Sequence, residues 1–143
     1  MLSLERFKVL DLSRMLPGPF TTHILADLGM QVTRVEELEP RYGMGRDAMT
    51  PVDLKPEEEV RATAFNTLAR NKRSIALNLL DPALRPASQE VFYSLAKQAD
   101  VIVEGYRPGA VTWMGVDYET IKRHNPRIIY CSLTGFGHGF AGR

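Results

Sequence analysis

Three histidines and one cysteine are the first side chains to consider for metal binding or nucleophilic catalysis. They are His23, His124, His138 and Cys131. No two histidines stand four residues apart, so the helical His-Glu-x-x-His arrangement of zinc proteases is absent, and one cysteine excludes a zinc site built from several. Cys131 falls within an apolar run, which favours a small buried side chain over a nucleophile. We therefore expect neither a metal site nor a catalytic residue among these side chains.

The segment after the first apolar run is where a nucleotide-binding loop would stand. Residues 13–19 read Ser-Arg-Met-Leu-Pro-Gly-Pro, with one glycine between two prolines instead of Gly-x-Gly-x-x-Gly. Proline has no N–H to donate, so this turn is poorly suited to cradle a pyrophosphate with its backbone. Ser13 also lacks the Gly-x-Ser-x-Gly turn of hydrolases. The sequence thus argues against a nicotinamide-dependent dehydrogenase, a serine hydrolase and a Walker-type phosphate loop.

Two basic segments could bind an anion. Residues 70–73 read Arg-Asn-Lys-Arg, and Arg107 stands in a Tyr-Arg-Pro-Gly turn. Cations near the end of a helix stabilise its dipole, and an exposed arginine is often only solvated. By residue type alone a solvated helix end or turn is favoured in both places, and anion binding stays open as the alternative.

Apolar runs and breaks predict the elements that position these residues. Short apolar or β-branched runs predict strands over residues 7–12, 31–35, 75–79, 101–103 and 128–133. Between them the spacing predicts a first helix marked by Phe20, Ile24, Leu25 and Leu28, and a second helix over 62–69. A third helix has a predicted buried stripe of Val91, Phe92, Leu95 and Ala99. Short helices are predicted over 110–114 and 118–122. This alternation predicts an α/β fold with a doubly wound sheet, whose ligands bind at the carboxyl ends of its strands.

Length and composition favour one domain spanning residues 1–143. The chain has 18 Lys+Arg against 17 Asp+Glu, and 44% of its residues are hydrophobic. A formal net charge of +1 gives no general attraction to nucleic acid, and no apolar run approaches the roughly 20 residues of a membrane span. With no signal-peptide core and one cysteine, we expect a reduced, cytoplasmic protein. Residues 36–60 are rich in proline and acidic side chains and predict a long mobile loop.

Ten short segments, in order along the whole chain, carry a resemblance to a known family. They are Val9–Ser13, Leu16–Phe20, Leu25–Gly29, Val35–Glu36, Asn71–Leu77, Ala99–Glu104, Tyr106–Ala110, Met114–Gly115, Asn125–Ser132 and Gly135–Gly137. Each is weak alone, but together they resemble the family III CoA-transferases, also called the CaiB/BaiF family. That family includes formyl-CoA transferases, carnitine CoA-transferases and α-methylacyl-CoA racemases.

The resemblance implies a fold, a ligand and an assembly. It implies a Rossmann-like parallel sheet with helices on both faces, with this chain as the N-terminal part of a CoA-binding large domain. It implies no tightly bound cofactor: CoA and acyl-CoA are substrates, carboxylic acids are acceptors, and the full-length enzyme is an interlocked homodimer. The family's CoA contacts fall here on Leu16, Pro17, Leu77, Asn78, Gly105, Tyr106 and Arg107.

This chain also departs from some members of that family. They place an arginine against the adenine where this chain has Glu37, and a basic residue where it has Thr134. The arginines available to replace the first are Arg14, Arg34 and Arg41.

The resemblance places the chemistry past Arg143. In the transferases an aspartate beyond the Gly-Phe-Gly segment attacks the donor thioester, and acyl and CoA exchange through anhydride and aspartyl-thioester intermediates. In the racemases a histidine and an aspartate in the same region exchange the α-proton. We therefore expect this chain alone to have no turnover. CoA transfer is the favoured function; an α-methylacyl-CoA racemase, or a truncated binding or interaction module without activity, are the alternatives.

Overall fold

The computed structural model describes residues 4–37, 67–135 and 137 of the chain. Within these ranges five strands form one sheet in the order β3-β2-β1-β4-β5, and every neighbouring pair is parallel. The strands are β1 (Lys8–Leu12), β2 (Gln31–Glu36), β3 (Lys72–Ala76), β4 (Val101–Glu104) and β5 (Ile129–Ser132). Nearly every residue of β1 and β4 is buried, as expected at the centre of a sheet covered on both faces.

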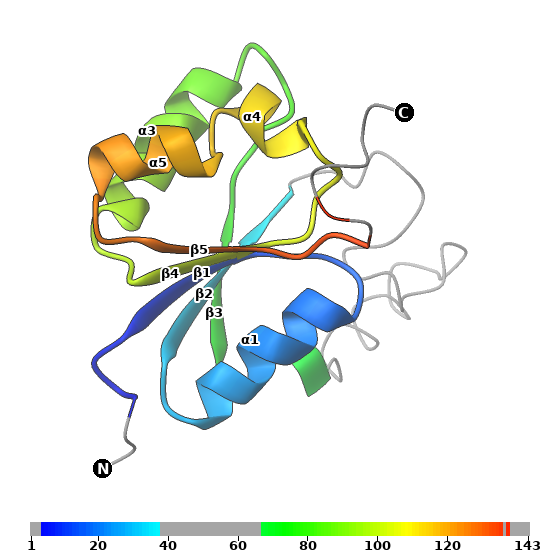
Figure 1. Ribbon diagram of the computed structural model, residues 1–143, viewed down its shortest axis with the longest axis vertical. Helices are drawn as coiled ribbons and strands as arrows, with labels where there is room; N and C mark the ends of the chain where they lie inside the picture. Colours follow the sequence, from blue (N-terminus) through cyan, green and yellow to red (C-terminus); the bar gives the residue numbers. More distant parts are fainter. Residues whose placement is uncertain (1–3, 38–66, 136, 138–143) are drawn as a thin grey trace.

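Helices cover both faces of this sheet (Figure 1). On one face lies α1 (Pro17–Asp27), with the single 3-10 turn η1 (Thr67–Ala69) beside it; on the other lie α3 (Arg85–Ala96), α4 (Ala110–Met114) and α5 (Tyr118–His124). The larger core cluster joins β1 and β4 to the α3–α5 layer, and the smaller one lies under α1. The predicted α/β fold, with a parallel sheet and helices on both faces, is confirmed.

Helix α1 turns its small residues toward the sheet. Gly18, Pro19, Thr22 and Ala26 are buried, whereas the large apolar residues spaced four apart are 44–55% exposed: Leu16, Phe20, Ile24 and Leu28. A Cβ atom on Gly18 would lie only 2.1 Å from the Cβ of Ser13, so α1 packs against the preceding turn too closely for a larger side chain. The apolar spacing therefore predicted the helix but not the side that it buries.

Strand β3 begins three residues earlier than the predicted 75–79. Among the described strands it pairs with β2 alone and lies at the edge of the sheet, where polar side chains on the strand are tolerated. Leu77 and Leu79 leave the strand and join the core under α3. The apolar run over residues 75–79 therefore predicts a strand that extends too far, because its second half fills the core instead of continuing β3.

Other predictions are confirmed in part. In the stripe predicted for α3, Phe92 is buried but Val91 is 43% exposed, and Ala99 is buried but lies after the end of the helix. The predicted helix over 62–69 is described only from residue 67, where η1 forms, and residues 62–66 lie outside the described part. Of the predicted loop over 36–60, Glu36 belongs to β2, and residues 38–60 also lie outside the described part. No described helix is both long and apolar enough to span a membrane.

Candidate functional site

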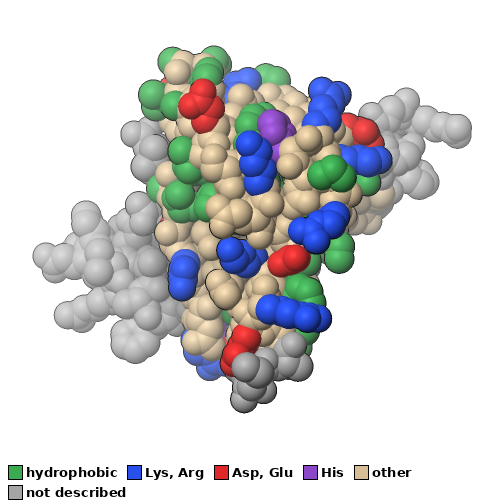
Figure 2. All heavy atoms as spheres, turned by 90° about the vertical axis from the view of Figure 1, so that its left-hand side faces the viewer, with side chains coloured by type: hydrophobic (Ala, Val, Ile, Leu, Met, Phe, Trp, Pro, Cys, Tyr) green, Lys and Arg blue, Asp and Glu red, His purple; other side chains and the backbone are tan. Residues whose placement is uncertain are grey.

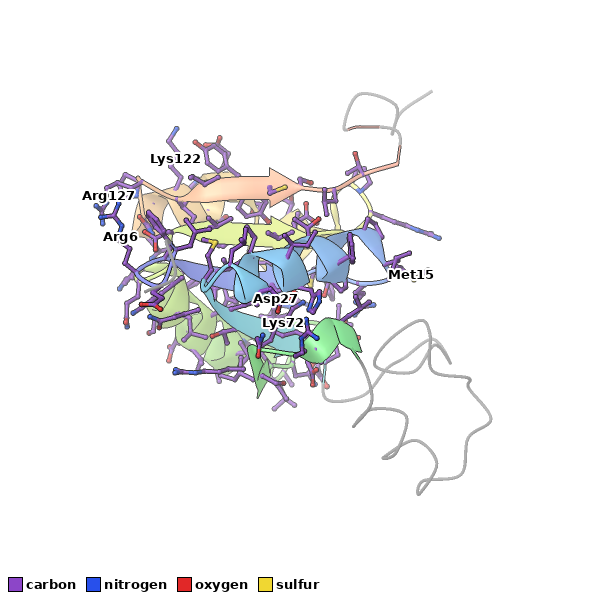
Figure 3. The ribbon with its side chains drawn as sticks, turned by 90° about the horizontal axis from the view of Figure 1, so that it is seen from below. Arg6, Met15, Asp27, Lys72, Lys122 and Arg127 are labelled. Atoms are coloured by element: carbon purple, nitrogen blue, oxygen red, sulfur yellow. The ribbon has the colours of Figure 1, made fainter. Side chains whose placement is uncertain are left out.

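The carboxyl ends of β1 and β4 form a switch point in the sheet. The two strands are neighbours, with Leu12 opposite Glu104, but the chain then passes to α1 on one face and to α4 on the other. Figure 3 shows Met15 at this end of the sheet, with Arg6 and Arg127 at the opposite end. Doubly wound folds bind their ligands outside such a point, because the two connections leave a crevice between them.

The turns that follow β1 and β4 touch each other. A Cβ atom on Gly105 would lie 3.8 Å from the backbone nitrogen of Arg14 and 3.9 Å from the Cβ of Ser13. The Cζ atom of Arg14 lies 4.9 Å from the centre of the Tyr106 ring, a cation–π distance. The same guanidinium forms an ion pair with Glu37, which directly follows β2. Arg14 thus connects three strand ends at this edge.

A buried ionic cluster around Asp11 holds the first turn. The Asp11 carboxylate is fully buried; it accepts hydrogen bonds from the N–H of Ser13 at 3.0 Å, from the hydroxyls of Ser13 and Thr22, and from the Lys72 ammonium at 3.0 Å. Lys72, whose side chain is 1% exposed, also donates to the Thr22 hydroxyl at 2.6 Å and to the carbonyl of Pro19 at 2.9 Å. This cluster ties β1, α1 and β3 together.

The basic segment 70–73 is solvated only in part, because Arg70 and Arg73 are exposed but Lys72 is not. Lys72 is buried in the Asp11 cluster, while Arg70 and Asn71 donate to the Asp27 carboxylate at the end of α1, at 2.6 and 2.8 Å. The hydrogen bond from Arg70 holds the pKa of Asp27 below its ordinary value. These contacts fasten β3 to α1, and the segment lies at the amino end of β3, away from the switch point.

A second buried carboxylate shapes the turn after β4. Glu104 is 1% exposed and accepts the N–H of Tyr106 at 2.8 Å and the hydroxyl of Ser132 on β5. Burial raises the pKa of Tyr130 well above its ordinary value, and the negative charge of Glu104 adds to this shift. Because its oxygens are buried and bound to protein donors, Glu104 supports the turn and is not presented to a ligand.

Five of the seven predicted CoA-contact residues lie in the two touching turns. Leu16 is 55% exposed directly before α1, which Pro17 begins, and Gly105 is exposed at the contact between the turns. Tyr106 lies beneath Arg14. The side chain of Arg107 is exposed and forms no hydrogen bond or ion pair with any described residue. The structure therefore brings these five residues together.

The other two predicted residues, Leu77 and Asn78, lie apart from the switch point. They follow β3, which β2 separates from β1. Leu77 is 7% exposed and packs into the core. The N–H of Asn78 donates to Ser88 at 3.1 Å, and its side-chain oxygen accepts the N–H of Asp81 at 2.9 Å. Their contacts shape the chain before α3, so only an elongated ligand could reach from the turns to this strand end.

Positive charge by itself does not mark the site. Figure 2 views the face at the amino ends of the strands and shows lysine and arginine side chains spread over it. Exposed basic residues at that end include Arg6, Lys97, Arg123 and Arg127. Among residues 4–37, 67–135 and 137, no three His, Cys, Asp or Glu side chains group as metal ligands. What distinguishes the switch point is that Arg14 and Arg107 lie on two turns that touch each other, and not the net charge of this end of the sheet.

The comparison with known proteins agrees with this architecture. A profile of CoA-transferase family III matches residues 4–142. The chain belongs to CoA-transferase family III. It is 43% identical over 134 residues to the succinyl-CoA:glutarate CoA-transferase of Homo sapiens, covering 94% of this chain and 28% of the human protein. It is 39% identical over 135 residues to the succinyl-CoA:mesaconate CoA-transferase of Haloarcula marismortui, covering 94% and 32%.

Solved structures of similar proteins share the fold of this family III chain. A CaiB/BaiF family protein from Brucella suis has a TM-score of 0.72 and 34% identity, covering 95% of this chain and 34% of that one. A hypothetical protein from Mycobacterium tuberculosis has a TM-score of 0.77 and 27% identity, covering 99% and 36%. The family resemblance is confirmed, and the chain spans 28–36% of the length of these four proteins.

Proposed function

We propose that this chain is the CoA-binding part of an enzyme that moves CoA from an acyl-CoA to a carboxylic acid. The observation that carries the proposal is Arg107, exposed and without a described partner, beside Tyr106 and the Leu16–Pro17 turn at the switch point of a family III sheet. A guanidinium suits phosphate oxygens because it donates two parallel hydrogen bonds. The exposed side chains of Met15 and Leu16 offer an apolar surface for the pantetheine arm.

The proposed reaction needs a nucleophile that the switch point does not present. An enzyme carboxylate would attack the donor thioester carbonyl and release the CoA thiolate, which would then attack the enzyme carbonyl of the mixed anhydride and release the donor acid. The acceptor carboxylate would attack the resulting enzyme thioester and release CoA again. This thiolate would attack the acceptor carbonyl of the second anhydride, which gives the acyl-CoA product and the free enzyme carboxylate. Asp11, one residue before the end of β1, and Glu104, the last residue of β4, are buried carboxylates that already accept hydrogen bonds from protein donors. We therefore expect the nucleophile beyond Arg143, where the family resemblance places it, and we expect the 143-residue chain to bind CoA without turnover.

The named relatives favour CoA transfer over racemisation, since both are CoA-transferases by name. The proposal includes a cytoplasmic enzyme with no tightly bound cofactor that works as an interlocked homodimer. The apolar row on the outer side of α1 would offer such an assembly a surface to cover, because Phe20, Ile24 and Leu28 are 44–50% exposed.

Calorimetric titration of CoA into the 143-residue chain tests the proposal. Arg107→Ala should weaken CoA binding about tenfold or more, because a hydrogen bond to a charged group is worth about 1.5–3 kcal/mol. Arg127→Ala is the matched control, since it removes another exposed arginine at the opposite end of the sheet. No binding of CoA to the wild-type chain would contradict the CoA site, and equal affinities of the two variants would contradict the role of Arg107.

A further inference from the structure

Arg14 is the second arginine at the switch point, and its charge is already neutralised. Its side chain is 40% exposed and forms an ion pair with Glu37, whose side chain is 18% exposed. Its Cζ atom lies 4.9 Å from the centre of the Tyr106 ring. In contrast, Arg107 on the neighbouring turn has no described partner. One of the two arginines at this edge therefore holds an internal anion.

The two contacts of Arg14 use different parts of the guanidinium. The ring of Tyr106 interacts with the cation through its π-face, whereas a carboxylate or phosphate accepts the N–H groups in the guanidinium plane. Tyr106 is itself fixed, because Glu104 accepts its backbone N–H at 2.8 Å. The cation–π contact can thus keep Arg14 at the edge while the anion on its N–H groups is exchanged.

We propose that Arg14 binds a phosphate group of CoA, and that Glu37 is the internal anion which this phosphate displaces. The inference rests on the proposed CoA site and adds to it a binding residue and a competing carboxylate. The Arg14–Glu37 ion pair is partly exposed and therefore weak, so breaking it on CoA binding lowers CoA affinity by at most about fivefold. A phosphate monoester carries a charge of about −1.5 to −2 and three acceptor oxygens, whereas a carboxylate carries one charge and two oxygens, so exchange for the monoester phosphate of CoA favours the ligand.

Glu37 also gives the site selectivity. An acceptor acid carries a carboxylate like that of Glu37, and it would have to displace an equivalent group that is already in place. The internal ion pair therefore discriminates against free carboxylates and in favour of phosphate-bearing ligands, which is specificity obtained from a competing contact.

Calorimetric titration of CoA into three variants of the chain tests this exchange. Arg14→Ala should weaken CoA binding about tenfold, whereas Glu37→Gln should strengthen it about two- to fivefold because the competing charge is gone. Glu36→Gln is the matched control: it removes the same charge one residue away, from a carboxylate that lies 3.6 Å from the nearly buried Arg34. It should leave CoA affinity unchanged. Circular dichroism checks that each variant is folded.

Each other outcome overturns part of the account. Unchanged affinity in Arg14→Ala would remove Arg14 from the site. Weaker or unchanged CoA binding in Glu37→Gln would show that Glu37 does not compete with CoA for Arg14. An equal gain in CoA affinity in Glu36→Gln would show that the effect comes from long-range charge and not from the Arg14–Glu37 pair. If Arg107→Ala weakens CoA binding while Arg14→Ala does not, the proposed function stands and only this inference fails. If the wild-type chain binds no CoA, both fail.

Discussion

Replacing Lys72 by methionine tests what holds the first turn of the site. The Lys72 ammonium donates to Asp11 at 3.0 Å, to Thr22 at 2.6 Å and to the carbonyl of Pro19 at 2.9 Å, and its side chain is 1% exposed. Methionine keeps most of the volume but removes the charge and all three hydrogen bonds. It would leave the Asp11 carboxylate buried without its cation.

The size of the loss follows from that geometry. Removing one partner of a buried ion pair costs about 3–5 kcal/mol. Asp11 keeps its donors from Ser13 and Thr22, which places the expected loss near the lower end, at about 3 kcal/mol. A domain unfolds with a free energy of only about 5–15 kcal/mol, so the melting temperature should fall by roughly 10 °C.

Urea denaturation followed by circular dichroism measures this loss. Lys97→Met is the matched control, because Lys97 is exposed and follows α3, so its replacement should change stability by less than about 0.5 kcal/mol. Adding Asp11→Asn to Lys72→Met should recover part of the loss, since the amide needs no cation. Equal urea midpoints for Lys72→Met and Lys97→Met would refute the assignment of the buried pair.

Three further predictions concern turns and titrating groups. Gly115→Ala should destabilise more than Gly109→Ala, although both glycines have positive φ, +71° and +88°. Only at Gly115 would the new Cβ displace a side-chain amide, that of Gln89 at 2.4 Å, which donates to the carbonyl of Met114; equal melting temperatures would contradict this cost. Arg70→Ala should raise the pKa of Asp27 toward 3.8 in an NMR titration, and an unchanged pKa would contradict the Arg70–Asp27 contact. In the wild-type chain this contact stabilises the fold above pH 3.8, and the stabilisation is lost as the pH falls through the lowered pKa of Asp27. Tyr130→Phe should lower the free energy of unfolding by about 1 kcal/mol at neutral pH, because it removes the hydrogen bond from the Tyr130 hydroxyl to the carbonyl of Val116. Burial raises the pKa of Tyr130, so its contribution to stability is lost only above about pH 10; tyrosinate absorbance from Tyr130 in the folded chain near pH 10 would argue against this.

The sequence predicted elements well where burial alone decides them. The runs of β1 and β4 are apolar because both faces of a central strand are covered. Residues 75–79 look similar, yet only their first half is strand, because an apolar run also describes chain that fills the core. On α1 the decisive contact is the close approach of Gly18 to Ser13. That is a tertiary contact, and the helical spacing of large residues cannot reveal it.

The site was predictable as two turns but not as a set of contacts. Glycine and proline mark the ends of β1 and β4, so the residues of both turns could be named from the sequence. The partners of Arg14 could not, because Glu37 and Tyr106 reach it only through the strand order. A signal for the supports was available: Asp11 and Glu104 are charged residues in or directly after short apolar runs, and such residues are buried only with partners.

The prolines of the first turn explain why arginine side chains would take over phosphate recognition. A doubly wound fold commonly holds phosphate on the backbone N–H groups of the glycine-rich turn that opens its first helix. Here Pro17 and Pro19 remove two of those donors, and α1 packs closely against Ser13 at Gly18. In the proposed CoA site the phosphate-binding groups would then come from side chains at the same switch point. Arg14 on the first turn, which is paired with Glu37, and the exposed Arg107 on the neighbouring turn would supply them.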